Sequence, residues 1–232
     1  MIFEFTGLPG SGKSTICEDL ESWLKEQGYE VVNWLYHTAR WNKWHRIAHK
    51  LKLIFKFQFA HPILFQLARR IVKRSRQKGM KDSLSQYLNI LYVGALYWRY
   101  NKDRYHNKIV LFDQGKLQAL TSLIFRSEEK DIALLIPPSL REEHPNDVII
   151  HIDVTPEEIL SRLEKRTGTQ SRIERMNPED RLAALQKFEK AEESVLENEF
   201  LYKTLFRIDG KGLGKQELLK KVKQVFQDNK FL

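Results

Sequence analysis

The stretch FTGLPGSGKST, from Phe5 to Thr15, places three glycines, one proline and one cation between a strand-like segment and a helix-like one. Residues 2–6 are β-prone, and residues 14–27 have the pattern of a helix that ends at Gly28. The stretch satisfies the motif G-x-x-x-x-G-K-[ST] in the strand–loop–helix setting that this motif requires. It therefore predicts the start of the fold, with a bare loop between the first strand and the first helix.

Each residue type in this loop suits the binding of phosphate groups. Glycines allow backbone N–H groups to converge on phosphate oxygens, and the helix N-terminus adds partial positive charge. The Lys13 ammonium can reach terminal phosphates, and the Ser14 hydroxyl can ligate Mg²⁺. We therefore expect a triphosphate and Mg²⁺ to be held by Gly7, Gly10, Ser11, Gly12, Lys13, Ser14 and Thr15.

The remainder of the chain alternates strand and helix patterns. Further strands are predicted at residues 29–36, 108–112, 148–152 and 204–208. Helices are predicted at 83–105, from 155 onward, at 178–201 and at 214–228, with capping boxes at Ser83 with Gln86 and Thr155 with Glu158. Because parallel strands need crossover connections, this alternation predicts an α/β fold with a mostly parallel sheet.

A carboxylate follows the third predicted strand in the sequence KIVLFDQG. Asp113 would lie at the carboxyl end of that strand, where ligands bind in open α/β sheets. It can hold Mg²⁺ or accept the proton of an attacking hydroxyl, and the alternative is a cap on the next helix. Gly115 allows either the close approach of another group or a tight turn.

Cations cluster in the sequence SRLEKRTGTQSRIERM around Gly168. Arginines on a closing segment can stabilise the charge that develops in phosphoryl transfer, so Arg162, Arg166 and Arg172 are candidate catalytic residues. The alternative is a solvated helix with Glu164 and Glu174 as ion-pair partners.

The composition limits the class of protein. With 232 residues, of which 42% are hydrophobic, we expect one domain, residues 1–232. No apolar run approaches the length of a membrane span and no leader pattern precedes the first strand, so we expect a soluble, cytoplasmic protein. A single cysteine, Cys17, excludes an internal disulfide and a cysteine-built zinc site, and we expect it to pack on a helix.

The net charge of +9 is concentrated in residues 40–81, which contain thirteen Lys and Arg and no Asp or Glu. The rest of the chain has 26 cations and 30 anions. This basic block indicates contact with a polyanion or with an anionic membrane surface, the latter placing the protein peripherally at a membrane. The alternative is a solvated basic face. Residues 50–59 alternate with period two and fit a helix or a basic edge strand.

The segments GLPGSGKST, VLFDQG, IHIDVTPEEILSRLEKR and SRIERM together resemble the thymidylate kinase-like branch of the P-loop nucleoside and nucleotide kinases, over residues 1–38 and 108–232. The resemblance implies a P-loop NTPase three-layer sandwich with a five-stranded parallel sheet. It implies Mg²⁺-dependent transfer of a phosphoryl group from ATP to a small-molecule acceptor. It also implies an arginine-bearing lid at 162–177, a basic helical acceptor-site insertion at 39–107, and an adenine contact by FRIDGKGLGKQEL.

Two departures from that family concern the acceptor. Gln114 stands where thymidylate kinases have an arginine that grips the acceptor's phosphate, and Arg40 is displaced by one position in a loosely similar turn. We therefore expect Gln114 and Arg40 to bind an acceptor that is nucleoside-like, nucleotide-like or a sugar derivative with a free hydroxyl.

Other interpretations stay open. One is an ATP-gated protein that binds nucleic acid or a membrane surface with little turnover, and another is a polynucleotide 5′-hydroxyl kinase. The apolar face of residues 84–96 fits a homodimer contact or a core helix.

Overall fold

The computed structural model describes residues 1–33, 41–74, 79–100, 107–127, 147–165, 173–229 and 231. Five strands form one parallel sheet in the order β2-β3-β1-β4-β5. The strands are β1 Ile2–Thr6, β2 Val31–Asn33, β3 Ile109–Phe112, β4 Asp147–Asp153 and β5 Thr204–Asp209. The predicted α/β class and five-stranded parallel sheet are confirmed.

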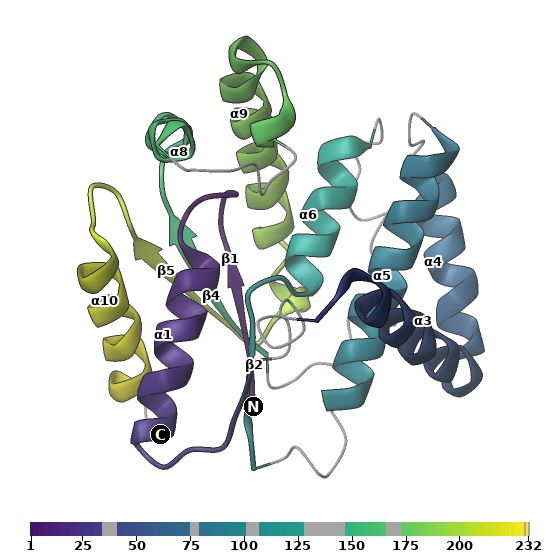
Figure 1. The fold of residues 1–232 in the computed structure, drawn as a ribbon, viewed down its shortest axis with the longest axis horizontal. Helices are drawn as coiled ribbons and strands as arrows, with labels where there is room; N and C mark the ends of the chain where they lie inside the picture. The colour runs from purple at the N-terminus through teal and green to yellow at the C-terminus, as the bar shows by residue number, and fades with distance from the viewer. Residues whose placement is uncertain are drawn as a thin grey trace.

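Helices cover both faces of the sheet (Figure 1). One side carries α1 Lys13–Glu26 and α10 Lys215–Asp228, and the other carries α5 Met80–Tyr100, α6 Lys116–Arg126 and α9 Pro178–Leu196. Outside α5 lie α3 Lys43–Ala60 and α4 Pro62–Arg74. The other elements of the described residues are α8 Pro156–Glu164 and the short 3₁₀ helices η3 Ile173–Arg175 and η4 Glu199–Leu201. No helix in the described ranges is long and apolar enough to cross a membrane.

The central strand β1 is buried along its whole length, as expected of a parallel strand covered on both faces. Phe3 and Phe5 face the cluster that contains α1 and α10, and Phe3 stacks on Phe226 of α10 with ring centroids 4.4 Å apart. On the opposite face, Ile2 packs with residues of α3 and α5. Cys17 is buried in the first of these clusters, which confirms its predicted packing role.

One predicted helix start is wrong. The capping box at Ser83 and Gln86 is absent, because α5 already begins at Met80 and the Gly79 carbonyl accepts from the Ser83 amide. Gln86 is buried beside α6, where its amide faces Ser122 and Arg126. The apolar face of α5 packs largely inside the chain, as Leu91 and Leu96 do.

Residues 50–59 belong to a helix and not to an edge strand. Asn42 caps α3, its side chain accepting from the His45 amide at 2.8 Å. Leu53, Ile54 and Phe57 are the buried residues of this helix, and they lie on the face toward α5. The three- and four-residue spacing of buried side chains overrides the period-two alternation of the sequence.

A buried carboxylate ties β1 to the start of α6. Glu4 is fully buried, and it accepts from the backbone amides of Lys116 at 3.0 Å, Leu117 at 2.8 Å and Gln118 at 3.2 Å. The Tyr97 hydroxyl also donates to it, at 2.7 Å. The unpaired amides and partial positive charge of the helix N-terminus thus compensate the buried negative charge.

Position 115 has no room for a side chain, because Glu4 occupies the space beside the Gly115 backbone. A Cβ atom on Gly115 would lie 2.5 Å from Oε2 of Glu4. We predict that Gly115→Ala lowers the free energy of unfolding by about 2–3 kcal/mol, since neither the strand nor the helix start can move away freely. Chemical denaturation measures the change.

Gly79→Ala is the matched control, because a Cβ there meets nothing within 4 Å. Its expected cost is about 1 kcal/mol or less, the usual range for a helix start. Equal losses in the two variants would contradict the role assigned to Glu4.

Candidate functional site

The glycine-rich loop between β1 and α1 adopts the backbone conformation that its composition predicts. Gly7, Gly10 and Gly12 have φ values of 141°, 98° and 99°, a region that other residues rarely adopt. The loop also approaches its neighbours closely. A Cβ on Gly10 would lie 3.0 Å from the Leu163 side chain of α8, so the tip of the loop packs directly on that helix.

Lys13 is buried inside the loop that precedes it. Its ammonium donates to the carbonyls of Gly7 at 2.6 Å and Leu8 at 2.8 Å, and to Ser11 Oγ at 3.3 Å. Burial lowers the pKa of Lys13, while the negative charges of Glu192 and Asp113 act in the opposite direction. The Lys13 ammonium is thus surrounded by oxygen acceptors that belong to the loop itself.

Asp113 lies beside the loop, as its position after β3 predicts. Its Oδ2 accepts from the Ser14 hydroxyl at 2.6 Å. Its Oδ1 is buried and has no hydrogen-bond partner among the described residues. Asp113 does not cap α6, since Gly115 occupies the N-cap position. The two oxygen ligands that the sequence suggested for Mg²⁺ are therefore adjacent, and the orphaned carboxylate oxygen fits a hard cation.

A second carboxylate, that of Glu192, binds the first residues of the glycine-rich loop. Glu192 of α9 is buried, and its Oε1 accepts from the Gly7 amide at 2.6 Å and from the Thr6 hydroxyl. The sequence offered no signal for this residue, because Glu192 lies more than 180 positions from the loop, among several other acidic residues of one helix.

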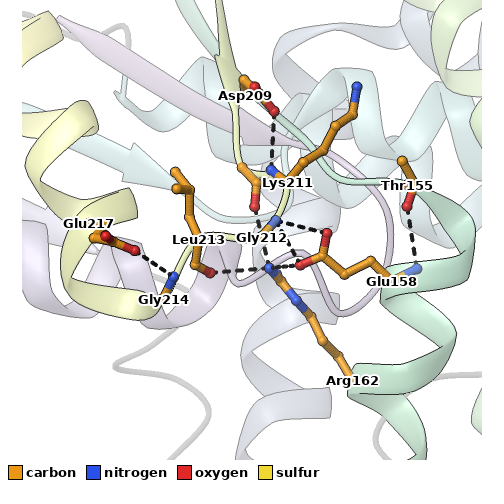
Figure 2. A network of polar contacts seen from close by, with 10 residues as sticks. Thr155, Glu158, Arg162, Asp209, Lys211, Gly212, Leu213, Gly214 and Glu217 are labelled. Carbon is orange, nitrogen blue, oxygen red and sulfur yellow. Dashed lines mark hydrogen bonds and ion pairs between the residues drawn. The ribbon is translucent and has the colours of Figure 1, made fainter.

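A polar network joins α8 to the loop between β5 and α10 (Figure 2). Arg162 donates to Glu158 at 2.6 Å and to the carbonyls of Gly210 and Leu213, both at 3.3 Å. Glu158 in turn accepts from the Gly212 amide at 3.0 Å. The predicted cap of α8 is also present, since Thr155 Oγ1 accepts from the Glu158 amide. The network positions residues 210–214 against the helix that touches the loop tip.

The sequence-predicted arginines have different outcomes. Arg162 is engaged with residues 210–214, and its partner carboxylate is Glu158 rather than Glu164. Arg40, Arg166 and Arg172 lie outside the described residues, so their predicted roles stay predictions. Gln114 is described and exposed, next to Asp113.

Uncharged polar groups lie buried at the carboxyl end of the edge strand β2 and in the first turn of α6, which follows β3. Asn33 ends β2 and is 1% exposed, yet neither polar atom of its amide has a partner in the described part of the chain. The Oε1 atom of Gln118, in the first turn of α6, is likewise buried without a partner. Unsatisfied buried amides are rare in folded proteins and call for a ligand, a water or another explanation.

The five-stranded parallel sheet and the glycine-rich loop after its central strand are the features of the P-loop kinase fold. The comparisons with solved structures agree with this fold. Deoxyadenosine kinase from M. mycoides with bound dATP aligns with a TM-score of 0.55 at 16% identity, over 98% of this chain and 100% of that one. The same enzyme with the products dCMP and dCDP aligns with a TM-score of 0.55 at 14% identity, over 98% and 99% of the two chains. Shikimate kinase from Bacteroides thetaiotaomicron aligns with a TM-score of 0.50 at 9% identity, over 99% and 98%.

No protein-family model matches the sequence, and no curated protein matches it either. The likeness to solved structures therefore concerns the fold, which extends over nearly the whole chain.

The network around Arg162 predicts a dynamic effect. Arg162→Ala removes the donor that holds two backbone carbonyls and the Glu158 carboxylate. We expect amide hydrogen exchange in residues 210–214 to accelerate at least about tenfold, because hydrogen bonds to charged groups contribute about 1.5 kcal/mol or more. Lys165→Ala is the control, a cation at the exposed end of the same helix. Unchanged exchange in the Arg162 variant would contradict this assignment.

His151 of β4 predicts a pH dependence of stability. Burial lowers the pKa of His151 from its ordinary value of 6.5, and Arg207 acts in the same direction, against the negative charges of Glu192 and Glu193. As the pH falls through 6.5, the unfolded chain takes up a proton before the folded one does, so stability decreases.

We expect His151→Gln to flatten this decrease by at most about 1.4 kcal/mol per pH unit, the slope for one proton. Denaturation midpoints between pH 7.5 and 5.5 measure it, with the exposed His45→Gln as control. Equal slopes in wild type and His151→Gln would refute the prediction.

Proposed function

We propose that this protein is an ATP-dependent kinase that transfers a phosphoryl group to a hydroxyl of a small acceptor. The observation that carries the proposal is the adjacency of the glycine-rich loop, the buried Lys13 ammonium and the Ser14–Asp113 pair. The fold likeness to deoxyadenosine kinase and shikimate kinase supports it, since both act on small molecules according to their names. In this proposal the loop from Gly7 to Thr15 binds the triphosphate of ATP.

The charges of the loop suit this role. The positive φ of the glycines lets successive amides face one oxygen-rich ligand, and the α1 N-terminus adds partial positive charge. Lys13 now donates to carbonyls of its own loop, and phosphate oxygens are stronger acceptors that can replace them. Helix α8 contacts both the tip of the glycine-rich loop, through Leu163, and residues 210–214, through Arg162. Residues 210–214 therefore lie near the loop and form the candidate adenine contact.

Mg²⁺, held by Ser14 and Asp113, would neutralise charge on the transferring phosphates. Among the described residues no group of three or more His, Cys, Asp or Glu side chains could hold a metal on its own. Two protein oxygens completed by substrate phosphates and water are the usual arrangement for Mg²⁺. Asp113 can alternatively accept the proton of the acceptor hydroxyl, since its Oδ1 has no partner in the described chain.

The acceptor is proposed to present a free hydroxyl and uncharged polar groups, as a nucleoside or a sugar derivative does. Gln114 contributes no cation for an acceptor phosphate, and the buried amides of Asn33 and Gln118 can exchange hydrogen bonds with the uncharged donors and acceptors of such a compound. Arg162, Arg166 and Arg172 stay proposed contributors to phosphoryl stabilisation through a lid at 162–177, and Arg40 to acceptor binding.

The test is ADP release with ATP and Mg²⁺ across a panel of nucleosides, nucleoside monophosphates, sugars and 5′-hydroxyl oligonucleotides. We expect one hydroxyl acceptor class to stimulate turnover. Lys13→Ala and Asp113→Asn should each lower kcat by about 100-fold or more, because each removes a group aimed at the developing charge.

Lys25→Ala is the control, since Lys25 lies on the same helix as Lys13 and its ammonium pairs with Glu21 one turn away. Tight ATP binding without stimulation by any class would overturn the proposal in favour of a nucleotide-gated binding protein. Stimulation only by nucleoside monophosphates would overturn the proposal that the acceptor carries no phosphate group, which rests in part on Gln114.

A further inference from the structure

Helix α3 carries an apolar stripe on the side that faces away from α5. The stripe consists of Trp44, Ile47, Leu51, Phe55 and Phe59, at spacings of three and four residues that place them on one helix face. Trp44 is 78% exposed, Phe55 60% and Phe59 73%. A single exposed apolar side chain is common on protein surfaces. A continuous row of five is typical of a surface that binds another molecule.

The stripe is not a loosely packed core face. The opposite side of α3 already packs through Leu53, Ile54 and Phe57 into clusters with α4 and α5, and the helix lies at the outside of the molecule in Figure 1. An open hollow of 420 Å³ lies along the stripe, lined by Leu51, Lys52, Ile54, Phe55 and Gln58. The helix is therefore anchored by one face and presents the other to its surroundings.

Exposed cations border this stripe. Lys52 and Lys56 follow its edge along the helix, and two further exposed cations, Lys43 and Arg46, lie elsewhere in the first turn of α3. No acidic residue occurs between positions 40 and 81, so no carboxylate of the same segment neutralises them. The described ion pairs involve none of these four side chains.

We propose that the α3 stripe docks on the surface of an anionic phospholipid bilayer. Apolar side chains along one helix face with lysines at the margin are the arrangement of helices that lie in the membrane interface. The apolar residues would enter the boundary between headgroups and acyl chains, while Lys52 and Lys56 would contact the negative headgroups. This inference goes beyond the proposed kinase activity and needs neither ATP nor an acceptor.

Charge and chemistry favour this occupant over two others. A second copy docked through the same stripe would bring two basic segments together, and like charges oppose such contact. Nucleic acid is bound by cations aimed at phosphates with aromatic rings for stacking, whereas Ile47 and Leu51 in the middle of this surface offer neither.

The experiment is cosedimentation of the full chain with vesicles in 0.1 M salt without ATP. Vesicles of phosphatidylcholine and phosphatidylserine at 7:3 should bind at least about ten times more protein than pure phosphatidylcholine vesicles. The variant Leu51→Ser/Phe55→Ser should lower the partition coefficient at least tenfold, because it removes the side chains that enter the interface. Lys52→Gln/Lys56→Gln should lower it roughly tenfold and weaken its salt dependence.

Leu84→Ser is the matched control, an exposed leucine of α5 that is not in the stripe, and it should bind as wild type does. The side chains substituted in α3 and α5 are all exposed, and an unchanged thermal midpoint checks the fold. Lys13→Ala should bind vesicles normally, so failure of the kinase assay and failure of docking are distinguishable.

The inference is overturned if the Leu51→Ser/Phe55→Ser variant binds vesicles like wild type. It is equally overturned if a DNA duplex binds in place of vesicles. A wild-type dimer that the stripe variant converts to a monomer, without vesicle binding, would assign the surface to a second copy instead.

Discussion

The hydrogen bonds of the buried Glu4 carboxylate are the constraint on which the candidate site depends. Glu4 extends from the central strand and receives three backbone amides from the first turn of α6. These amides begin three residues after Asp113 in the chain, so the distance between β1 and the turn after β3 is set by several hydrogen bonds to one carboxylate. The same strand leads into the glycine-rich loop. One buried charge therefore determines how Ser14 and Asp113 meet, and Gly115 is the backbone position that makes room for it.

Glu192 adds a second buried charge on the same face of the sheet, and its effect is electrostatic as well as geometric. It fixes the first amide of the loop, and its negative charge favours the ammonium form of Lys13 against the burial that lowers the pKa of that residue. A cation that is desolvated and already surrounded by oxygens needs little reorganisation when phosphate oxygens take their place. The cost of burying the two carboxylates is offset by backbone amides and hydroxyl donors, because a buried charge needs such partners.

The sequence allowed prediction of the features that depend on residues close together in the chain. The loop, the order of strands and helices, the Thr155 cap and the position of Asp113 follow from local spacing and the parallel topology. Glu4 and Glu192 could not be found this way, because a buried acid is recognised only once its distant partners are known. The alternation of residues 50–59 suggested a strand as readily as a helix, and the cap at Asn42 was the local signal that decides between them. Ser83 failed as a helix start because a cap-like residue can equally lie within a first turn.

The basic segment is rich in cations, whereas the candidate acceptor site is lined mainly by uncharged amides, and this difference bears on the partner of each. The cations of α3 lie on its exposed surface, except Lys50, which is half-buried with its ammonium 4.7 Å from the ring centre of Tyr92. Apart from Lys50, the face that α3 turns to the interior is apolar, so little of the charge of this helix is directed into the molecule. Near this end of the sheet the side chains without partners in the described part of the chain are the amides of Asn33 and Gln118 and the Oδ1 atom of Asp113, and Gln114 is an exposed, uncharged amide. The positive charge of this chain is thus concentrated where it meets its surroundings, which is the distribution expected if an anionic surface and an uncharged acceptor are bound by different parts of one fold.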